Sequence, residues 1–99
     1  MRKTRNQEKY CSAMAVPVPK TREQEVLLYE CVWDLLYTIP EWLHSTVHYR
    51  LFEGETLLET GRVLGVTDSA VGHREKKAKR LLGHPTRARF LEEYRQLMD

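Results

Sequence analysis

Residues 56–85 read TLLETGRVLGVTDSAVGHREKKAKRLLGHP, and this stretch carries the most informative pattern of the chain. Thr56 and Glu59 have the spacing of a capping box, in which each side chain accepts a hydrogen bond from the backbone N–H of the other residue. A short helix is therefore predicted to begin there. Gly61 lies inside this helix, where the missing side chain allows a second helix to pack closely and at a steep angle.

The second half of the stretch predicts a turn and a longer helix. Gly65 supplies the positive φ of a tight turn, and Thr67 is a natural N-cap for a helix that runs to about Leu82, with Gly83 behind it. Such a helix-turn-helix places the N-terminal residues of its second helix in the major groove of DNA. The apolar residues that would join the two helices are Leu57, Leu64, Val66 and Val71.

Three further helices are predicted around this pair. A capping box that begins at Thr21 opens an apolar helix that reaches about residue 39. Pro40 suits the first turn of the next helix, and Gly54 can end that helix in a left-handed conformation. Pro85 starts the last helix. No stretch alternates with period two, so the sequence predicts an all-α fold, a small bundle of about five helices.

The N-terminal part of the chain is predicted to lie outside this bundle. Residues 1–19 are polar and basic and end in Val-Pro-Val-Pro, which disfavours a helix. We therefore expect a flexible basic arm over 1–19 and one domain over 20–99. Cys11 would lie in the arm and Cys31 in an apolar helix, which favours reduced thiols. With no signal peptide and no apolar run of membrane-spanning length, a cytoplasmic protein is predicted.

The net charge of +2 hides an uneven distribution. Residues 21–66 carry three bases and eight acids, whereas residues 67–90 carry seven bases against only Asp68 and Glu75. Concentrated positive charge suits a polyanion, because each neutralised phosphate releases counterions. A solvated helix face has the same composition, so this interpretation of the basic run stays open.

The stretch that begins at residue 56 resembles region 4, the promoter-reading C-terminal domain of bacterial sigma factors. The residues that match the usual wording of that family are Thr56-Leu57, Glu59, Gly61, Val66-Thr67, Lys77-Ala78, Arg80, Leu82 and His84-Pro85-Thr86-Arg87. The likeness covers about residues 39–90. Nothing resembles the other regions of a sigma factor, so we expect a stand-alone region 4, as in a phage or accessory regulator.

The resemblance implies a sigma-like transcription regulator that docks on the β flap of bacterial RNA polymerase and contacts double-stranded promoter DNA. It would work at the nucleoid, in the host cytoplasm if a phage encodes it. Ser69 and His73 are the residues suited to base edges, and the others are suited to phosphates. The expected DNA-binding set is Arg62, Thr67, Ser69, His73, Lys76, Lys77 and Arg80.

The apolar helices that precede the helix-turn-helix hold the flap in the family. The expected partner-binding set is therefore Leu28, Trp33, Leu36, Trp42, Val47 and Leu51. Each of these residues could equally build the core of the domain.

Two other functions stay open. Asp68, Ala70 and Gly72 stand where the family carries Arg, Glu and Gln, which favours a decoy that binds polymerase or another transcription factor without reading a promoter. A homodimeric repressor joined through the helix over 22–38 is the second. No set of side chains has enzymatic context, so no enzyme and no cofactor are predicted. His44 and His48 are one helical turn apart but lack a third ligand, so no metal site is predicted either.

Overall fold

The computed structural model describes residues 2–98 of the chain and the side chains of residues 5–98. Its helices are α1 (Arg2–Met14), α2 (Arg22–Leu36), η1 (Glu41–Leu43), α3 (His44–Val47), η2 (His48–Phe52), α4 (Leu57–Leu64), α5 (Asp68–Leu82), η3 (Pro85–Leu91) and α6 (Glu92–Met98). No strand occurs over residues 2–98, so the predicted all-α class is confirmed. None of the helices in this range is long and apolar enough to cross a bilayer.

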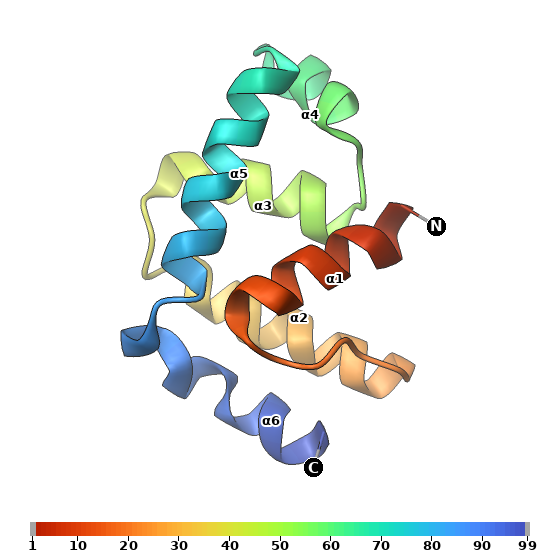
Figure 1. Cartoon of the computed structure of the whole chain (residues 1–99), viewed down its shortest axis with the longest axis vertical. Coiled ribbons are helices and arrows are strands. Elements are labelled where there is room, and N and C mark those ends of the chain that lie inside the picture. Colours follow the sequence, from red (N-terminus) through yellow and green to blue (C-terminus); the bar gives the residue numbers. More distant parts are fainter. Residues whose placement is uncertain (1, 99) are drawn as a thin grey trace.

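The helix α4 and the start of α5 form one end of the molecule, α5 runs from there toward the other end, and α2 and α6 lie at that other end (Figure 1). Between these ends, α1 packs against α5 and η2. The core contains side chains from both ends and from α1, and its largest fully buried members are Tyr10, Tyr94, Leu28, Leu35, Leu43, Leu51, Leu82 and Leu91. The radius of gyration of the Cα atoms is 12.8 Å, the value expected for a compact domain of this length.

The predicted helix starts are confirmed where a threonine caps the helix. Thr21 and Thr56 both form complete capping boxes, and the Thr67 side chain accepts a hydrogen bond from the Ala70 N–H. Gly54 and Gly65 have φ angles of 70° and 72°, so both occupy the left-handed region predicted for them. These signals depend only on neighbouring residues, which is why the sequence reveals them.

The helix predicted from residue 40 to Gly54 is not uniform. It consists of a 3₁₀ turn (η1), one α-helical turn (α3) and a π-helical segment (η2). The helix that starts at Pro85 likewise begins as 3₁₀ in η3 and becomes α-helical only in α6. The positions of these helices were predictable, but their hydrogen-bond patterns were not.

The prediction of a flexible arm over 1–19 is wrong, because residues 2–14 form α1 and its apolar side is part of the core. Tyr10 and Cys11 have no exposed surface. The Asn6 amide donates to the carbonyl oxygens of Arg50 and Glu55 at 2.7 and 3.0 Å. Beyond the helix, the hydroxyl of Tyr94 donates to the carbonyl oxygen of Pro17 at 2.6 Å. The domain therefore includes α1, and Cys11 is a core residue.

The C-terminal end of α5 meets the C-terminal end of α1 at Gly83. A Cβ atom on Gly83 would lie 2.0 Å from the carbonyl oxygen of Ala13, so no larger residue fits. The φ angle of Gly83 is −87°, which any residue can adopt. The glycine is therefore required for space and not for a left-handed turn.

Candidate nucleic-acid interface

The outward side of α5 carries polar and basic side chains along its whole length. The exposed residues there are Ser69, His73, Lys76, Lys77 and Arg80. Each lies three or four residues from another member of the set, so they share one side of the helix. The opposite side carries Val71, Glu75, Ala78 and Leu82, all of which are buried.

Glu75, the acid within this basic run, points into the protein. Its carboxylate accepts hydrogen bonds from Arg50 Nε and Nη2 at 2.7 and 3.0 Å and from the Tyr10 hydroxyl at 3.0 Å. Burial, and next the Glu75 charge and hydrogen bond, hold the pKa of Tyr10 well above its usual value. Since Arg50 neutralises Glu75 in the interior, the outward side of α5 keeps its positive charge.

The N-terminal turn of α5 is shaped by Thr67 and Asp68. Thr67 Oγ1 accepts the Ala70 N–H at 3.1 Å, and Asp68 Oδ1 accepts the Ser69 N–H at 2.9 Å. A shallow hollow between α4 and α5 is lined by Leu57, Asp68, Ser69, Gly72, His73 and Lys76. A Cβ atom on Gly72 would have no other atom within 4 Å, so the α5 backbone is open to an approaching molecule at this point.

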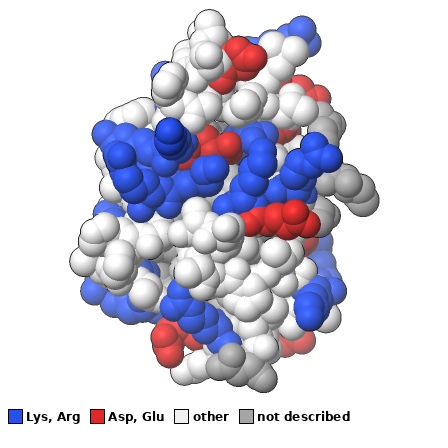
Figure 2. Space-filling model, in the orientation of Figure 1, with Lys and Arg blue, Asp and Glu red and all other residues white. Residues whose placement is uncertain are grey.

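All seven residues of the expected DNA-binding set are exposed, including Thr67 and, on α4, Arg62. Five of the seven form the outward side of α5, so the structure brings most of the set together. Figure 2 shows Lys and Arg side chains gathered in a band across the middle of one face, over α5 and α1. The sequence does not reveal the part of this band on α1, because the composition of residues 1–19 predicts a flexible arm there.

Trp42 stands beside this basic side, although it was expected in a partner-binding set. Its ring is half exposed, with the Lys77 Nζ atom 5.4 Å and the Arg74 guanidinium carbon 5.9 Å from the ring centroid. Both distances permit a cation–π interaction. Arg74 is partly exposed and lies over Trp42.

The expected partner-binding set is wrong for four of its six members. Their side chains are covered by the domain's own helices and belong to the core, where no partner can reach them; they are Leu28, Leu36, Val47 and Leu51. Trp33 and Trp42 are the two that remain half exposed. The sequence could not separate the two groups, because both have the apolar character of core residues.

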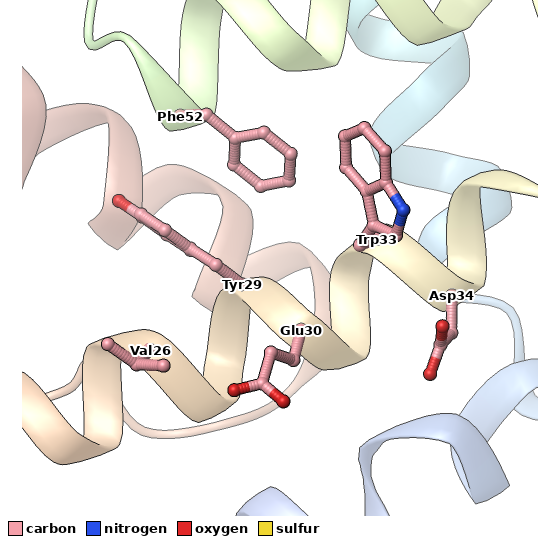
Figure 3. A pocket seen from close by; sticks show the side chains of 6 residues that line it. All are labelled: Val26, Tyr29, Glu30, Trp33, Asp34 and Phe52. Atoms are coloured by element: carbon pink, nitrogen blue, oxygen red, sulfur yellow. The ribbon is translucent and has the colours of Figure 1, made fainter.

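Trp33 forms part of an open apolar groove on the side of α2 that faces away from α5 (Figure 3). The Phe52 ring on η2 lies between Tyr29 and Trp33, with centroid distances of 5.0 Å and 6.2 Å. Val26 extends the apolar floor, and the carboxylates of Glu30 and Asp34 stand along one edge.

Two of the histidines, His44 and His48, contact other groups of the protein, and both cysteines are buried. His44 Nε2 lies 3.2 Å from the carbonyl oxygen of Ile39, and His48 Nε2 lies 3.5 Å from Glu53 Oε1. Over the described part of the chain, no group of three or more His, Cys, Asp and Glu side chains is placed to hold a metal ion. Cys11 and Cys31 are free thiols, and burial raises the pKa of Cys11 to about 11.

Comparison of the chain with known protein families, with curated proteins and with solved structures gives no match. What the protein does is therefore inferred from the residues and the geometry described above.

Proposed function

We propose that the protein binds double-stranded DNA through α4 and α5, which act as a helix-turn-helix with α5 in the major groove, and that it regulates transcription in the manner of sigma-factor region 4. The observation that carries this proposal is the outward side of α5, whose polar and basic residues are all exposed while Glu75 is turned inward. Such a surface provides hydrogen-bonding groups for base edges and cations for phosphates.

The junction of α4 and α5 supports this use. A Cβ atom on Gly61 would lie 2.6 Å from the carbonyl oxygen of Val66, so α4 and the turn approach as closely as the motif requires. Gly65 turns the chain and Thr67 caps α5. Ser69 and His73, near the N-terminus of α5, would then face base edges, and Lys76, Lys77 and Arg80 would face phosphates.

Docking on the β flap of bacterial RNA polymerase is the second half of the proposal, and it rests on the resemblance to region 4. The exposed groove around Trp33 and Phe52 supports it, because an apolar surface of this kind can accept an amphipathic helix from a partner. Trp33 is the residue of the expected partner-binding set that lies in this groove.

A decoy that binds polymerase without reading a promoter is the alternative that a specific observation favours. Asp68 is exposed at the N-terminus of α5, where its charge opposes phosphate, and Gly72 offers no side chain to a base. A decoy needs the apolar groove but not the basic side of α5. The two functions therefore predict different responses when that basic side is removed.

The test is a titration of labelled duplex DNA followed by fluorescence anisotropy at several salt concentrations. Lys77→Ala/Arg80→Ala is expected to lower the affinity and to reduce the slope of log affinity against log salt by about two, because two phosphate contacts are lost. The matched control is Lys20→Ala/Arg22→Ala, which removes the same charge beside the start of α2. An affinity that ignores salt and is equal in both variants would contradict DNA binding.

A pull-down with core RNA polymerase distinguishes the regulator from the decoy. Retention of polymerase by the wild type and by Lys77→Ala/Arg80→Ala, together with salt-dependent DNA binding by the wild type, supports the sigma-like regulator. Retention of polymerase without any DNA binding supports the decoy. If Trp33→Ala captures as much polymerase as the wild type, docking through the groove is ruled out.

A further inference from the structure

We infer that α1 is a second DNA-binding element, in which Arg5 and Lys9 bind phosphates of the backbone that runs beside α5. This inference rests on the proposed function, since it assumes that α5 enters the major groove. It extends the DNA-binding surface to a helix that lies outside the residues resembling region 4.

The position of α1 relative to α5 is fixed by contacts along its length. Gly83 leaves room for the carbonyl group of Ala13 at one end. Farther along, the Tyr10 hydroxyl donates to Glu75 on the inward side of α5 at 3.0 Å. The Asn6 amide holds the N-terminal part by bonds to the carbonyl oxygens of Arg50 and Glu55. Arg5 and Lys9 therefore extend from a backbone whose place beside α5 is determined.

Arg5 and Lys9 are on the exposed side of α1 and join the surface of α5. Both line a hollow with Thr56, Leu57 and Leu58 at the start of α4. Leu57 also lines the neighbouring hollow that contains Ser69, Gly72, His73 and Lys76. The two hollows therefore share the lining residue Leu57, which places the α1 cations near the N-terminal half of α5. The band in Figure 2 covers both helices.

Arg5 and Lys9 form no ion pair within the part of the chain that the structure describes. The ion pairs found there are Arg22–Glu25, His48–Glu53 and Arg50–Glu75. The one acid on the exposed side of α1, over residues 5–14, is Glu8. Glu55 also lines the hollow, and its carboxylate, whose Oε2 atom is buried without a hydrogen-bond partner, opposes part of this charge, so Arg5, Lys9 and Glu55 together leave one positive charge there.

The geometry of DNA explains why cations are useful at this place. A recognition helix in the major groove lies between two phosphate backbones, so an element held beside that helix faces one of them. On one side of α5 the flanking cations are Lys77 and Arg74, over Trp42. On the other side the flanking element is α1. Contacts on both sides would fix the angle at which α5 enters the groove.

The experiment is the salt-dependent titration of duplex DNA with the full-length chain. Arg5→Ala/Lys9→Ala is expected to weaken binding roughly tenfold at low salt and to reduce the salt slope by about two. Lys20→Ala/Arg22→Ala, with the same change in net charge, should leave the slope close to that of the wild type. Arg5→Lys/Lys9→Arg keeps both charges and should restore the slope.

A second variant is chosen to raise the affinity for DNA, because an unfolded protein could not produce such a gain. Glu8→Lys adds a cation to the exposed side of α1 and should raise the slope by about one. Glu23→Lys makes the same change on the exposed surface of α2, and a smaller increase is expected there.

The outcomes separate the inference from the proposed function. If the wild type binds no DNA, the proposed function fails and the inference falls with it. If Lys77→Ala/Arg80→Ala weakens binding but Arg5→Ala/Lys9→Ala matches the α2 control, α5 binds DNA and the inference about α1 alone is wrong. An equal gain from Glu8→Lys and Glu23→Lys would also overturn it, because only net charge would then matter.

Discussion

The two sides of α5 use charged residues in opposite ways. On the inward side, Glu75 is held by Arg50 and Tyr10 through three hydrogen bonds, and 7% of its side-chain surface is exposed. On the outward side, Lys76, Lys77 and Arg80 are exposed to solvent. The inward charge of Glu75 orients α5 on the domain, and the outward cations are free to bind a ligand.

A count of charges along α5 therefore underestimates its positive surface. Glu75 adds no negative charge to the outward side, because its charge is neutralised by Arg50 in the interior. The two sides are also separable experimentally. Changes on the inward side should alter the free energy of unfolding, and changes on the outward side should alter binding with little effect on stability.

The largest effect on the free energy of unfolding is expected when the buried ion pair between Arg50 and Glu75 is broken. Glu75→Ala leaves the Arg50 guanidinium buried without its charge partner, which should lower the free energy of unfolding by about 3–5 kcal/mol. Lys76→Ala, on the adjacent outward position, should change it by less than about 0.5 kcal/mol. Urea denaturation followed by circular dichroism measures both. Equal losses in the two variants would mean that the sides of α5 do not differ.

Smaller changes in the free energy of unfolding are expected from substitutions of two glycines, Gly72 within α5 and Gly83 at its C-cap. Gly83→Ala places a Cβ atom against the carbonyl group of Ala13 and should destabilise the protein by about 1–3 kcal/mol. Gly72→Ala places its Cβ atom in open space and should stabilise the helix by up to about 1 kcal/mol. The same urea experiment compares them, and a stabilising Gly83→Ala would contradict the close contact between α1 and α5.

The residues that were predictable from sequence are those whose structure depends on their neighbours. Thr21, Thr56 and Thr67 cap helices through atoms three residues away, and Gly65 turns the chain by its own φ angle. The exposed side of α5 was predictable for a related reason, since spacing within one helix determines which residues share a side.

Residues whose role depends on distant partners were not predictable. The helix α1 presents Asn6 to the interior, and the groups that satisfy this amide lie 44 and 49 residues away. Arg50 and Glu75 are 25 residues apart, so no local spacing reveals their pair. Leu28 and Val47 are predicted to bind a partner but lie in the core, because the sequence does not show which helix covers them.

Alkaline pH should lower the free energy of unfolding gradually. The buried Tyr10, Cys11 and Tyr94 all have pKa values raised above their ordinary values, chiefly by burial. The folded state therefore keeps protons that the unfolded state releases, so stability is full below about pH 9 and falls as the pH rises. For each group the fall is limited to about 1.4 kcal/mol per pH unit.

The measurement is the free energy of unfolding in urea between pH 8 and pH 11. Cys11→Ala removes the group whose pKa is about 11, so its stability should fall less steeply than that of the wild type above pH 9. Cys11→Ala also leaves a small cavity, so the slopes with pH are compared and not the absolute stabilities. A stability that rises with pH in this range would contradict the direction of these pKa shifts.

The smallest effect concerns the outward side, where the Trp42 ring restrains Lys77. Trp42→Ala should lower DNA affinity by roughly twofold, because an exposed cation–π contact contributes about 0.5–1 kcal/mol and only part of it positions the cation for phosphate. Trp33→Ala is the matched control, since both tryptophans are 51% exposed and Trp33 stacks on Phe52 with a ring-centroid separation of 6.2 Å.

Trp33→Ala is expected to leave DNA affinity unchanged in the anisotropy titration, because the groove around Trp33 is lined by residues of α2 and η2 and by none of the expected DNA-binding residues. The two substitutions therefore assign the exposed tryptophans to different surfaces, Trp42 to the DNA-binding side of α5 and Trp33 to partner docking. If Trp33→Ala weakens DNA binding and Trp42→Ala does not, the outward side of α5 is not the surface that meets DNA.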